Sequence, residues 1–205
     1  MSRDGGTVLA ALVDALERLP GIGARTARRL AEHLLRVPEG EALGLADALR
    51  AARARLRPCS RCAAPAETDP CARCADPARR DDVLLVVETL RDRDAVEATG
   101  RYDGRYFVLA GRLSPLEGRD VGDLGLDALR TRVADGLVRE VVVATNPDLE
   151  GDGAARAIAR SLVDLGVAVT RLARGVPTGG QIEHQNAAAI TDALRGRRPL
   201  DDADA

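Results

Sequence analysis

Apolar residues recur at helical spacing in three segments near the start of the chain. The first pattern begins at Val8, the second at Ala27, and the third follows Pro38. Apolar side chains three or four positions apart lie on one face of a helix, and proline is tolerated in a first helical turn but not in a helix interior. Pro58 therefore ends the third helix, and we predict a helical region over residues 1–57.

Short apolar runs alternate with helical patterns from residue 81 onward. Strands are predicted over residues 83–87, 106–109, 141–144 and 167–172, and helices over residues 92–99, 126–134 and 153–165. Alternating strands and helices are typical of a mostly parallel sheet with both faces covered. The fold class is therefore α/β, with a sheet domain over residues 78–174 and a C-terminal segment, helix and tail over residues 175–205.

A loop-rich insert over residues 58–77 separates the helical region from the sheet domain. It contains two Cys-x2-Cys pairs eight residues apart, Cys59 with Cys62 and Cys71 with Cys74. Four thiolates on two tight turns bind zinc tetrahedrally, and a full set of protein ligands leaves no position for a reactive water. We predict one structural zinc ion here. Two disulfides or four unused thiols are the alternatives.

The composition limits how much a single arginine can signify. All 30 basic residues are arginine, so this residue type is used wherever a positive charge is needed. The net charge of −2 divides into about +4 over residues 1–80 and about −6 over residues 81–205. A basic first part suits a polyanion and an acidic second part suits a cation or a basic partner, although both imbalances are small.

A glycine turn precedes the second predicted helix in the segment LPGIGARTARRLAEHLL. Gly21 and Gly23 allow another backbone to approach closely, and the unpaired amides at a helix N-terminus attract phosphate. Arg25, Arg28 and Arg29 lie away from the apolar face of this helix. The pattern is that of a helix-hairpin-helix motif, which contacts the DNA backbone without reading base sequence. The alternative is an ordinary turn between helices with solvated arginines.

Acidic and amide side chains follow two of the predicted strands. Glu88 ends the first strand, and Asn146, Asp148, Glu150 and Asp152 follow the third. Carboxylates at the carboxyl ends of parallel strands meet in the usual ligand crevice of an α/β sheet. Their oxygens suit magnesium, with phosphate completing the coordination shell. The alternative for Asp152 is a charge that only stabilises the start of a helix.

This strand-end glutamate and the later acidic loop resemble the Toprim domain of topoisomerases, primases and some nucleases. Asn146 stands where the catalytic Toprim pattern has its first aspartate, which argues against metal-dependent catalysis. A topoisomerase also needs a nucleophilic tyrosine. The two tyrosines, Tyr102 and Tyr106, lie in the short segment that enters a strand, and neither is placed for DNA cleavage.

The order of helix-hairpin-helix motif, four-cysteine zinc finger and Toprim domain resembles the RecR family of bacterial recombination mediators. The resemblance covers nearly the whole chain, and its most specific stretches are the cysteine pairs, RYFVLAGRLSPLEG, ATNPDLEGD and LARGVPTGGQIE. The last stretch is similar to a Walker-B-like region of that family but lacks the Gly-Lys-Ser/Thr of a phosphate-binding loop. His184 stands where the family usually has an aromatic residue.

The resemblance implies a non-enzymatic protein that forms a ring, from dimer to tetramer, and grips duplex or gapped DNA. It implies action with RecO and RecF to promote RecA loading, with DNA contacts by Arg25 and Arg29. The same resemblance implies an acidic face for RecO or for magnesium, formed by Glu88, Asp148, Glu150 and Asp152. Independently, several copies would raise the affinity of a hairpin that offers few phosphate contacts.

The expected cellular location follows from two sequence features that we do not find, a membrane span and a secretory signal. No apolar run reaches the length of a membrane span, and no secretory signal pattern precedes the first predicted helix. We therefore expect a cytoplasmic protein with no membrane partner.

Two other function classes stay open at this point. A magnesium-dependent Toprim enzyme that cuts or rejoins DNA would use most of the same residues, but it needs a nucleophile or a metal-activated water. A scaffold that binds only proteins would leave the arginines of the hairpin unused. Asn146 and the positions of the two tyrosines favour the DNA-binding adaptor.

Overall fold

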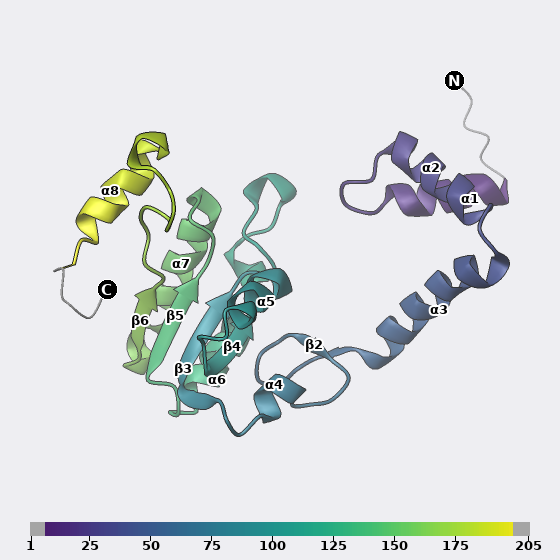
Figure 1. Ribbon diagram of the computed structural model, residues 1–205. Coiled ribbons are helices and arrows are strands. Elements are labelled where there is room, and N and C mark those ends of the chain that lie inside the picture. The colour runs from purple at the N-terminus through teal and green to yellow at the C-terminus, as the bar shows by residue number, and fades with distance from the viewer. Residues whose placement is uncertain (1–6, 199–205) are drawn as a thin grey trace. The chain divides into compact units, whose positions relative to one another are not determined.

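The computed structural model describes residues 7–198, and it divides into two compact units with a boundary between Leu56 and Arg57 (Figure 1). Among the described residues, the first unit is helical and the second contains the strands. The charged tail predicted after Pro199 lies outside the described residues. No helix among the described residues has the length and apolar character needed to cross a bilayer.

The first unit consists of α1 (Val8–Glu17), α2 (Ala24–Leu34) and α3 (Glu39–Arg55), which confirms the three predicted helices. Thr7 begins α1, and its hydroxyl accepts a hydrogen bond of 3.1 Å from the backbone N–H of Ala10. Ala27 and Ala31 on α2 are fully buried, and they are the only buried residues in these three helices. Their small side chains allow α1 and α2 to pack closely.

Helix α3 keeps its apolar side chains exposed within this unit. Leu43, Leu45 and Leu49 are 54%, 48% and 59% exposed. The leucines that predicted this helix therefore do not build a core within the unit. A helix with an uncovered apolar surface is suited to packing against another chain.

The second unit is built on a four-stranded parallel sheet with the order β4-β3-β5-β6 (Figure 1). The strands are β3 (Arg80–Val87), β4 (Gly104–Val108), β5 (Glu140–Ala144) and β6 (Ala168–Arg171), and the connecting helices are α5 (Leu90–Ala98), α6 (Leu126–Ala134) and α7 (Leu149–Leu162). Val87 pairs with Val108 on one side and with Ala144 on the other. The carboxyl ends of these three strands are therefore level. The predicted parallel sheet is confirmed.

The two faces of the sheet carry separate cores, because successive side chains of a strand point to opposite sides. On one face, strand residues pack under α6 and α7; this core includes Leu84, Val86, Phe107, Leu129, Val133, Val141, Val143, Ile158 and Leu162. On the other face, Leu85, Val87, Tyr106 and Val108 pack against the cysteine insert, with Leu90 and Val96 of α5 at its margin. Both faces are covered, as predicted, but the second is covered largely by the insert.

The insert itself is small and irregular. It contains the two-residue strands β1 (Arg57–Pro58) and β2 (Pro65–Ala66), which pair antiparallel, and the short helix α4 (Ala72–Ala75). Beyond the sheet, the chain forms a single helical turn at residues 182–184 and then α8 (Ala187–Arg195). The side chain of Asn186 begins α8 by accepting the Ala189 N–H at 2.8 Å.

Strand β3 and helix α7 begin three and four residues earlier than their sequence patterns predict. Strand β3 starts at Arg80, because the Arg80 N–H donates to the Asp103 carbonyl at 2.9 Å and extends the strand through polar residues. Helix α7 starts at Leu149 instead of residue 153. Its first five residues include Gly151 and Gly153, whose low helix propensity hides the start of the helix in the sequence.

Candidate functional site

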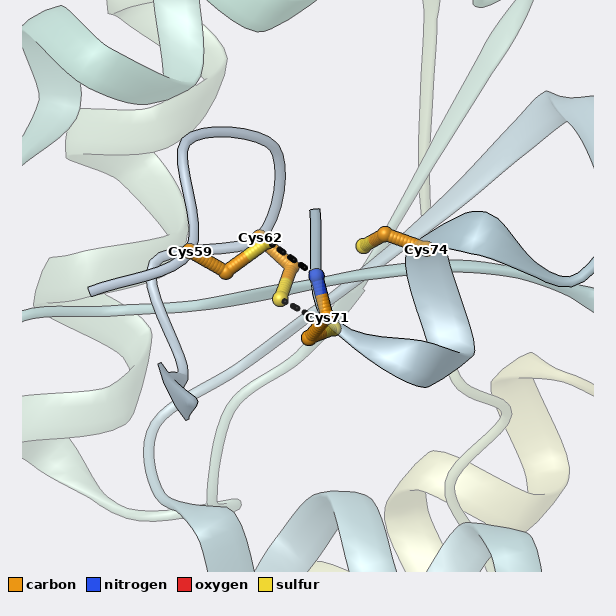
Figure 2. A group of neighbouring side chains, drawn as sticks. All are labelled: Cys59, Cys62, Cys71 and Cys74. Carbon is orange, nitrogen blue, oxygen red and sulfur yellow. Dashed lines mark hydrogen bonds between the residues drawn. The ribbon is translucent and has the colours of Figure 1, made fainter. Parts of the chain in front are cut away.

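The four cysteines converge on one point, and their sulfur atoms all lie within 4.8 Å of one another (Figure 2). The first pair lies on a tight turn after β1, in which the Cys59 N–H donates to the Ala64 carbonyl at 2.8 Å and the Ala63 N–H donates back to the Cys59 carbonyl at 2.9 Å. The second pair lies at α4, with Cys71 at its start and Cys74 within it. Two separate turns thus supply two sulfurs each.

The chemistry of this cluster fits zinc. The sulfurs of Cys62 and Cys71 are 3.7 Å apart, well beyond the roughly 2.05 Å of a disulfide bond, and all four thiols are free. The Cys71 N–H donates to the Cys59 sulfur at 3.3 Å, an interaction that favours a thiolate. The Cys74 thiol lowers the pKa of Cys62 to about 5, and the same contact together with burial raises the pKa of Cys74. Cys62 and Cys74 thus favour opposite protonation states. A divalent cation removes this opposition, because it stabilises all four thiolates at once.

The residues therefore form a site for one structural zinc ion, as predicted. Cys59, Cys62, Cys71 and Cys74 are all cysteines of the insert, and four protein sulfurs complete a tetrahedral shell. Such a site contributes folding energy to a segment with few apolar residues of its own.

Strand β4 holds the main chain of both cysteine pairs. The buried guanidinium of Arg105 donates to the carbonyls of Arg73 and Cys74 at 3.0 and 3.3 Å, and it also donates to Asp81 at 2.9 Å. The Val108 N–H donates to the Cys62 carbonyl at 2.9 Å. The zinc site is therefore continuous with the sheet on which it packs.

The hairpin between α1 and α2 is a tight glycine turn that leads directly into α2. Gly21 has a φ of +77°, in the left-handed region that a side chain disfavours. The Ile22 N–H closes the turn on the Leu19 carbonyl at 3.0 Å. Gly23 begins α2 and has no side chain to cap the helix, so the first amides of α2 stay available for an anion.

Three arginines follow this turn and are all exposed. Arg25, Arg28 and Arg29 line a surface hollow of about 400 Å³ together with Thr26 and Glu32. Arg28 pairs with Glu32 at 3.4 Å. Within the part of the chain that the structure describes, neither Arg25 nor Arg29 has an acidic side chain at ion-pair distance. These two guanidinium groups are free to take an external anion.

Glu88 lies immediately after β3, and its side chain is completely buried. The amide of Asn146, two residues after β5, donates a hydrogen bond to Glu88 Oε2, whereas Glu88 Oε1 has no hydrogen-bond partner among the described residues. Burial raises the pKa of Glu88, and the Asn146 and Arg112 contacts oppose that shift. The two strand ends are thus joined directly.

Asp148 begins helix α7 and accepts the Gly151 N–H at 2.8 Å. This hydrogen bond lowers the pKa of Asp148, and Arg112 lowers it further. The turn is tight: a side chain on Gly151 would place its Cβ 2.1 Å from the Asn146 carbonyl oxygen. The position therefore requires glycine.

Arg112, from the loop after β4, lies among three of the four predicted acidic residues. Its guanidinium contacts the carboxylate of Asp148 and lies 3.7 Å from the carboxylates of both Glu88 and Glu150. The structure thus brings Glu88, Asp148 and Glu150 together around a positive side chain. Sequence reasoning did not select Arg112, although it lies in the family-specific stretch RYFVLAGRLSPLEG.

Asp152 belongs to a different cluster. It lies in the first turn of α7 and pairs with Arg171 at 2.6 Å and with Arg174. Arg174 lowers the pKa of Asp152 most, and Arg171 adds to the effect. Among residues 7–198, the four cysteines are the only group of three or more potential metal ligands that lie close enough to share an ion.

The two tyrosines lie in the core on the zinc side of the sheet. Tyr102 donates its hydroxyl to the Arg105 carbonyl at 2.8 Å, and its ring meets that of Tyr106 edge-on at 5.0 Å. Burial raises the pKa of both hydroxyls. His184, in contrast, is exposed, with its ring 3.9 Å from the Glu183 carboxylate.

These features define a class of proteins that join a helix-hairpin-helix unit, a four-cysteine zinc finger and a Toprim domain. Residues 9–53 match the RecR helix-hairpin-helix family, residues 56–76 match the RecR four-cysteine zinc finger domain, and residues 82–173 match the Toprim domain. The chain belongs to the RecR family.

Relatives of similar length support this membership. The chain is 48% identical to the "Recombination protein RecR" of Roseiflexus sp. (strain RS-1) over 189 residues, which cover 92% of each chain. It is 46% identical to the protein of that name from Rhodopirellula baltica over 200 residues, 98% of this chain and 100% of the relative. It is 45% identical to that of Heliobacterium modesticaldum over 92% of this chain and 95% of the relative.

Proposed function

We propose that this protein is a non-enzymatic, DNA-binding adaptor in recombinational DNA repair. Its relatives are named recombination proteins, and the observation that carries the DNA-binding part is the hairpin, where Arg25 and Arg29 are exposed and free of acidic partners among the described residues. An adaptor of this kind acts in the cytoplasm, where the bacterial chromosome lies.

Binding at this hairpin is independent of base sequence. Gly21 and Gly23 bring backbone amides to a phosphate, and Arg25, Arg28 and Arg29 neutralise its neighbours along the strand. None of these groups needs to enter a groove to do so, so duplex and gapped DNA both present the same ligand. The affinity should therefore depend strongly on salt and weakly on sequence.

The test replaces both unpaired arginines. Arg25→Ala/Arg29→Ala should weaken binding to a gapped duplex and lower the slope of log affinity against log salt by about 2 per bound subunit. The matched control is Arg50→Ala/Arg80→Ala, which removes the same charge at exposed arginines that pair with Asp47 and Asp82. An unchanged slope in the first variant would contradict the assignment. If the wild-type protein binds no gapped DNA at low salt, the protein-only scaffold is the better interpretation.

We further propose that the protein assembles into a closed ring, from dimer to tetramer. Only Ala27 and Ala31 are buried in the three N-terminal helices, whereas Leu43, Leu45 and Leu49 are about half exposed. Self-association would cover these leucines and would place several hairpins on one DNA. Light scattering should give a solution mass above that of the 21.6 kDa chain. Leu45→Glu/Leu49→Glu should reduce that mass, and a monodisperse wild-type monomer at micromolar concentration would refute assembly.

The acidic loop is the proposed docking surface for RecO, with RecF as a second partner. Asp148 and Glu150 lie against Arg112 but are 40% and 39% exposed, so they can also reach basic side chains of another protein. Glu88 supports the loop through its ion pair with Arg112, and Asp152 supports it through its ion pair with Arg174. Asp148→Asn/Glu150→Gln should weaken RecO binding in a pull-down and slow RecA loading on gapped DNA coated by single-strand-binding protein. Glu41→Gln/Asp47→Asn on α3 is the matched control.

The competing function is a magnesium-dependent Toprim enzyme that cleaves or rejoins DNA, which the parallel sheet with Glu88 and Asp148 at its carboxyl end would favour. The buried tyrosine hydroxyls and the amide at Asn146 support the adaptor instead. Supercoiled, nicked and gapped DNA should stay intact with magnesium. Cleavage or relaxation that disappears in Glu88→Gln would favour the enzyme over the adaptor.

A further inference from the structure

The Toprim fold implies a magnesium ion held by carboxylates at the ends of β3 and β5. The residues present do not fit that ion. Arg112 lies among the carboxylates of Glu88, Asp148 and Glu150, at the place where a shared cation would have to sit.

We propose that Arg112 is the resident cation of the acidic loop, and that its guanidinium replaces and excludes a divalent metal ion. By resident cation we mean a positive side chain of the protein that neutralises carboxylates grouped for a metal. The proposal rests on the non-enzymatic function proposed above, and it supplies a physical reason for that function.

The spacing of the carboxylates suits a guanidinium. Magnesium draws its oxygen ligands to about 2.0–2.1 Å from a single point, whereas a guanidinium is a wide planar fork that meets different carboxylates at different N–H groups. Glu88 and Glu150 each lie 3.7 Å from Arg112 nitrogens, and Asp148 contacts Nη2 directly. The three carboxylates therefore surround a space that suits a guanidinium group better than a single metal ion.

Asn146 removes one of the oxygens that a metal ion would need. Its amide nitrogen donates to Glu88 Oε2, so this position presents an N–H donor to the glutamate. The other oxygen, Glu88 Oε1, is buried and unpaired among the described residues. A buried acceptor without a partner is costly, so Glu88 stays available to a small cation that could reach it if Arg112 were absent.

The loop that carries Arg112 is held in place on both sides. Ser114 and Arg119 pair through backbone hydrogen bonds of 3.1 and 3.0 Å, which closes the loop behind Arg112. Leu113 packs against α7 so closely that a Cβ on Gly153 would lie 2.9 Å from its Cδ2. The backbone that carries Arg112 is thus held by its own loop, and the guanidinium extends from it to the acidic residues.

Metal binding can be measured without reference to activity. The experiment titrates Mn²⁺, a spectroscopic substitute for Mg²⁺, into the full-length zinc-loaded protein and follows free Mn²⁺ by electron paramagnetic resonance. We expect Arg112→Ala to gain one Mn²⁺ site at least about tenfold tighter than any site of the wild-type protein. Arg112→Ala/Asp148→Asn should lose the gained site. Mn²⁺ or Mg²⁺ should also raise the unfolding temperature of Arg112→Ala, but not that of the wild type.

Arg112→Gln provides a second variant in case Arg112→Ala does not fold, because glutamine keeps a hydrogen-bond donor and removes the charge. The zinc content and the circular dichroism spectrum report folding. Equal Mn²⁺ affinity in the wild type and in a folded Arg112 variant would overturn the proposal, as would a folded variant that binds no Mn²⁺. DNA cleavage by the wild-type protein would instead refute the adaptor function, so the two failures are distinguishable.

Discussion

The guanidinium of Arg105 donates a hydrogen bond of 3.3 Å to the backbone carbonyl of Cys74. The two residues are 31 positions apart, one on a strand of the sheet and the other a sulfur ligand of the zinc site. A second hydrogen bond, to the neighbouring Arg73 carbonyl, fixes the direction of α4. The position of one zinc ligand therefore depends on a buried charge in the Toprim core.

Arg105→Ala should destabilise the second unit and accelerate zinc release. The change removes the donor from the carbonyls of Arg73 and Cys74 and breaks the ion pair with the partly exposed Asp81, a loss of about 3 kcal/mol in total. Zinc release to a chromogenic chelator and thermal unfolding measure the two effects. Arg80→Ala, which removes an exposed ion pair on the same unit, should change neither by much.

Loss of one zinc ligand should affect the second unit far more than the hairpin. Purified protein should contain one zinc ion per chain, and Cys74→Ser or Cys59→Ser should lose it. Because the cysteines form part of the core with Leu85 and Val87, the unfolding temperature should fall by about 10 °C. Elemental analysis and calorimetry test this. A variant that keeps full zinc content would contradict the four-ligand site.

Most of the fold follows from local patterns in the sequence. The apolar runs that became β3 and β5 are buried strands of a parallel sheet, and such strands read as continuous apolar segments. The cysteine spacing predicts the zinc site on its own. The start of β3 was missed because the Arg80 N–H pairs with the distant Asp103 carbonyl, and the start of α7 was missed because its glycines have low helix propensity.

Gly151→Ala should disrupt the acidic loop. The added Cβ would lie 2.1 Å from the Asn146 carbonyl oxygen, a backbone atom that cannot move without breaking the turn. We expect a loss of about 3 kcal/mol in the free energy of unfolding. Gly153→Ala on the same helix is the control, because its Cβ would meet only the flexible end of Leu113 and should cost much less. Similar stabilities for the two variants would contradict a close approach of Gly151 to the Asn146 carbonyl.

The charge of Asp148 should make a pH-dependent contribution to stability. The Gly151 N–H and Arg112 hold the pKa of Asp148 below its ordinary value of about 3.9, so the ionised form stabilises the folded state. This contribution is complete above the ordinary pKa and is lost as pH falls through the lowered one. Asp148→Asn keeps the cap but removes the charge, and because the side chain is 40% exposed it should cost at most about 1 kcal/mol.

Denaturant unfolding at neutral pH and in acid, below the ordinary pKa of an aspartate, checks that expectation. The wild type should exceed Asp148→Asn in stability at neutral pH, and the difference should shrink in acid. A difference that stays constant with pH would mean that the carboxylate acts only as a hydrogen-bond acceptor.

The acidic residues of the candidate site were recognisable from sequence, but the arginines that pair with them were not. Glu88 and Asp148 lie at predicted strand ends, where ligand crevices form. Arg112, Arg171 and Arg174 reach these acids from other segments, and in a chain whose basic residues are all arginine nothing marks them locally. Only the tertiary structure shows that Asp152 pairs with different arginines from the other three carboxylates.

The position of Arg112 also has an evolutionary consequence. Codons for asparagine and aspartate differ by a single nucleotide, so Asn146 can become an aspartate in one mutational step. That step alone would add an uncompensated negative charge beside the buried Glu88, while Arg112 would still fill the space between the carboxylates. Loss of Arg112 alone would leave its acidic neighbours without their counter-charge. On the proposed role of Arg112, metal-dependent chemistry would therefore require two changes in different loops: loss of Arg112 to admit the ion, and Asn146→Asp to supply a further ligand oxygen.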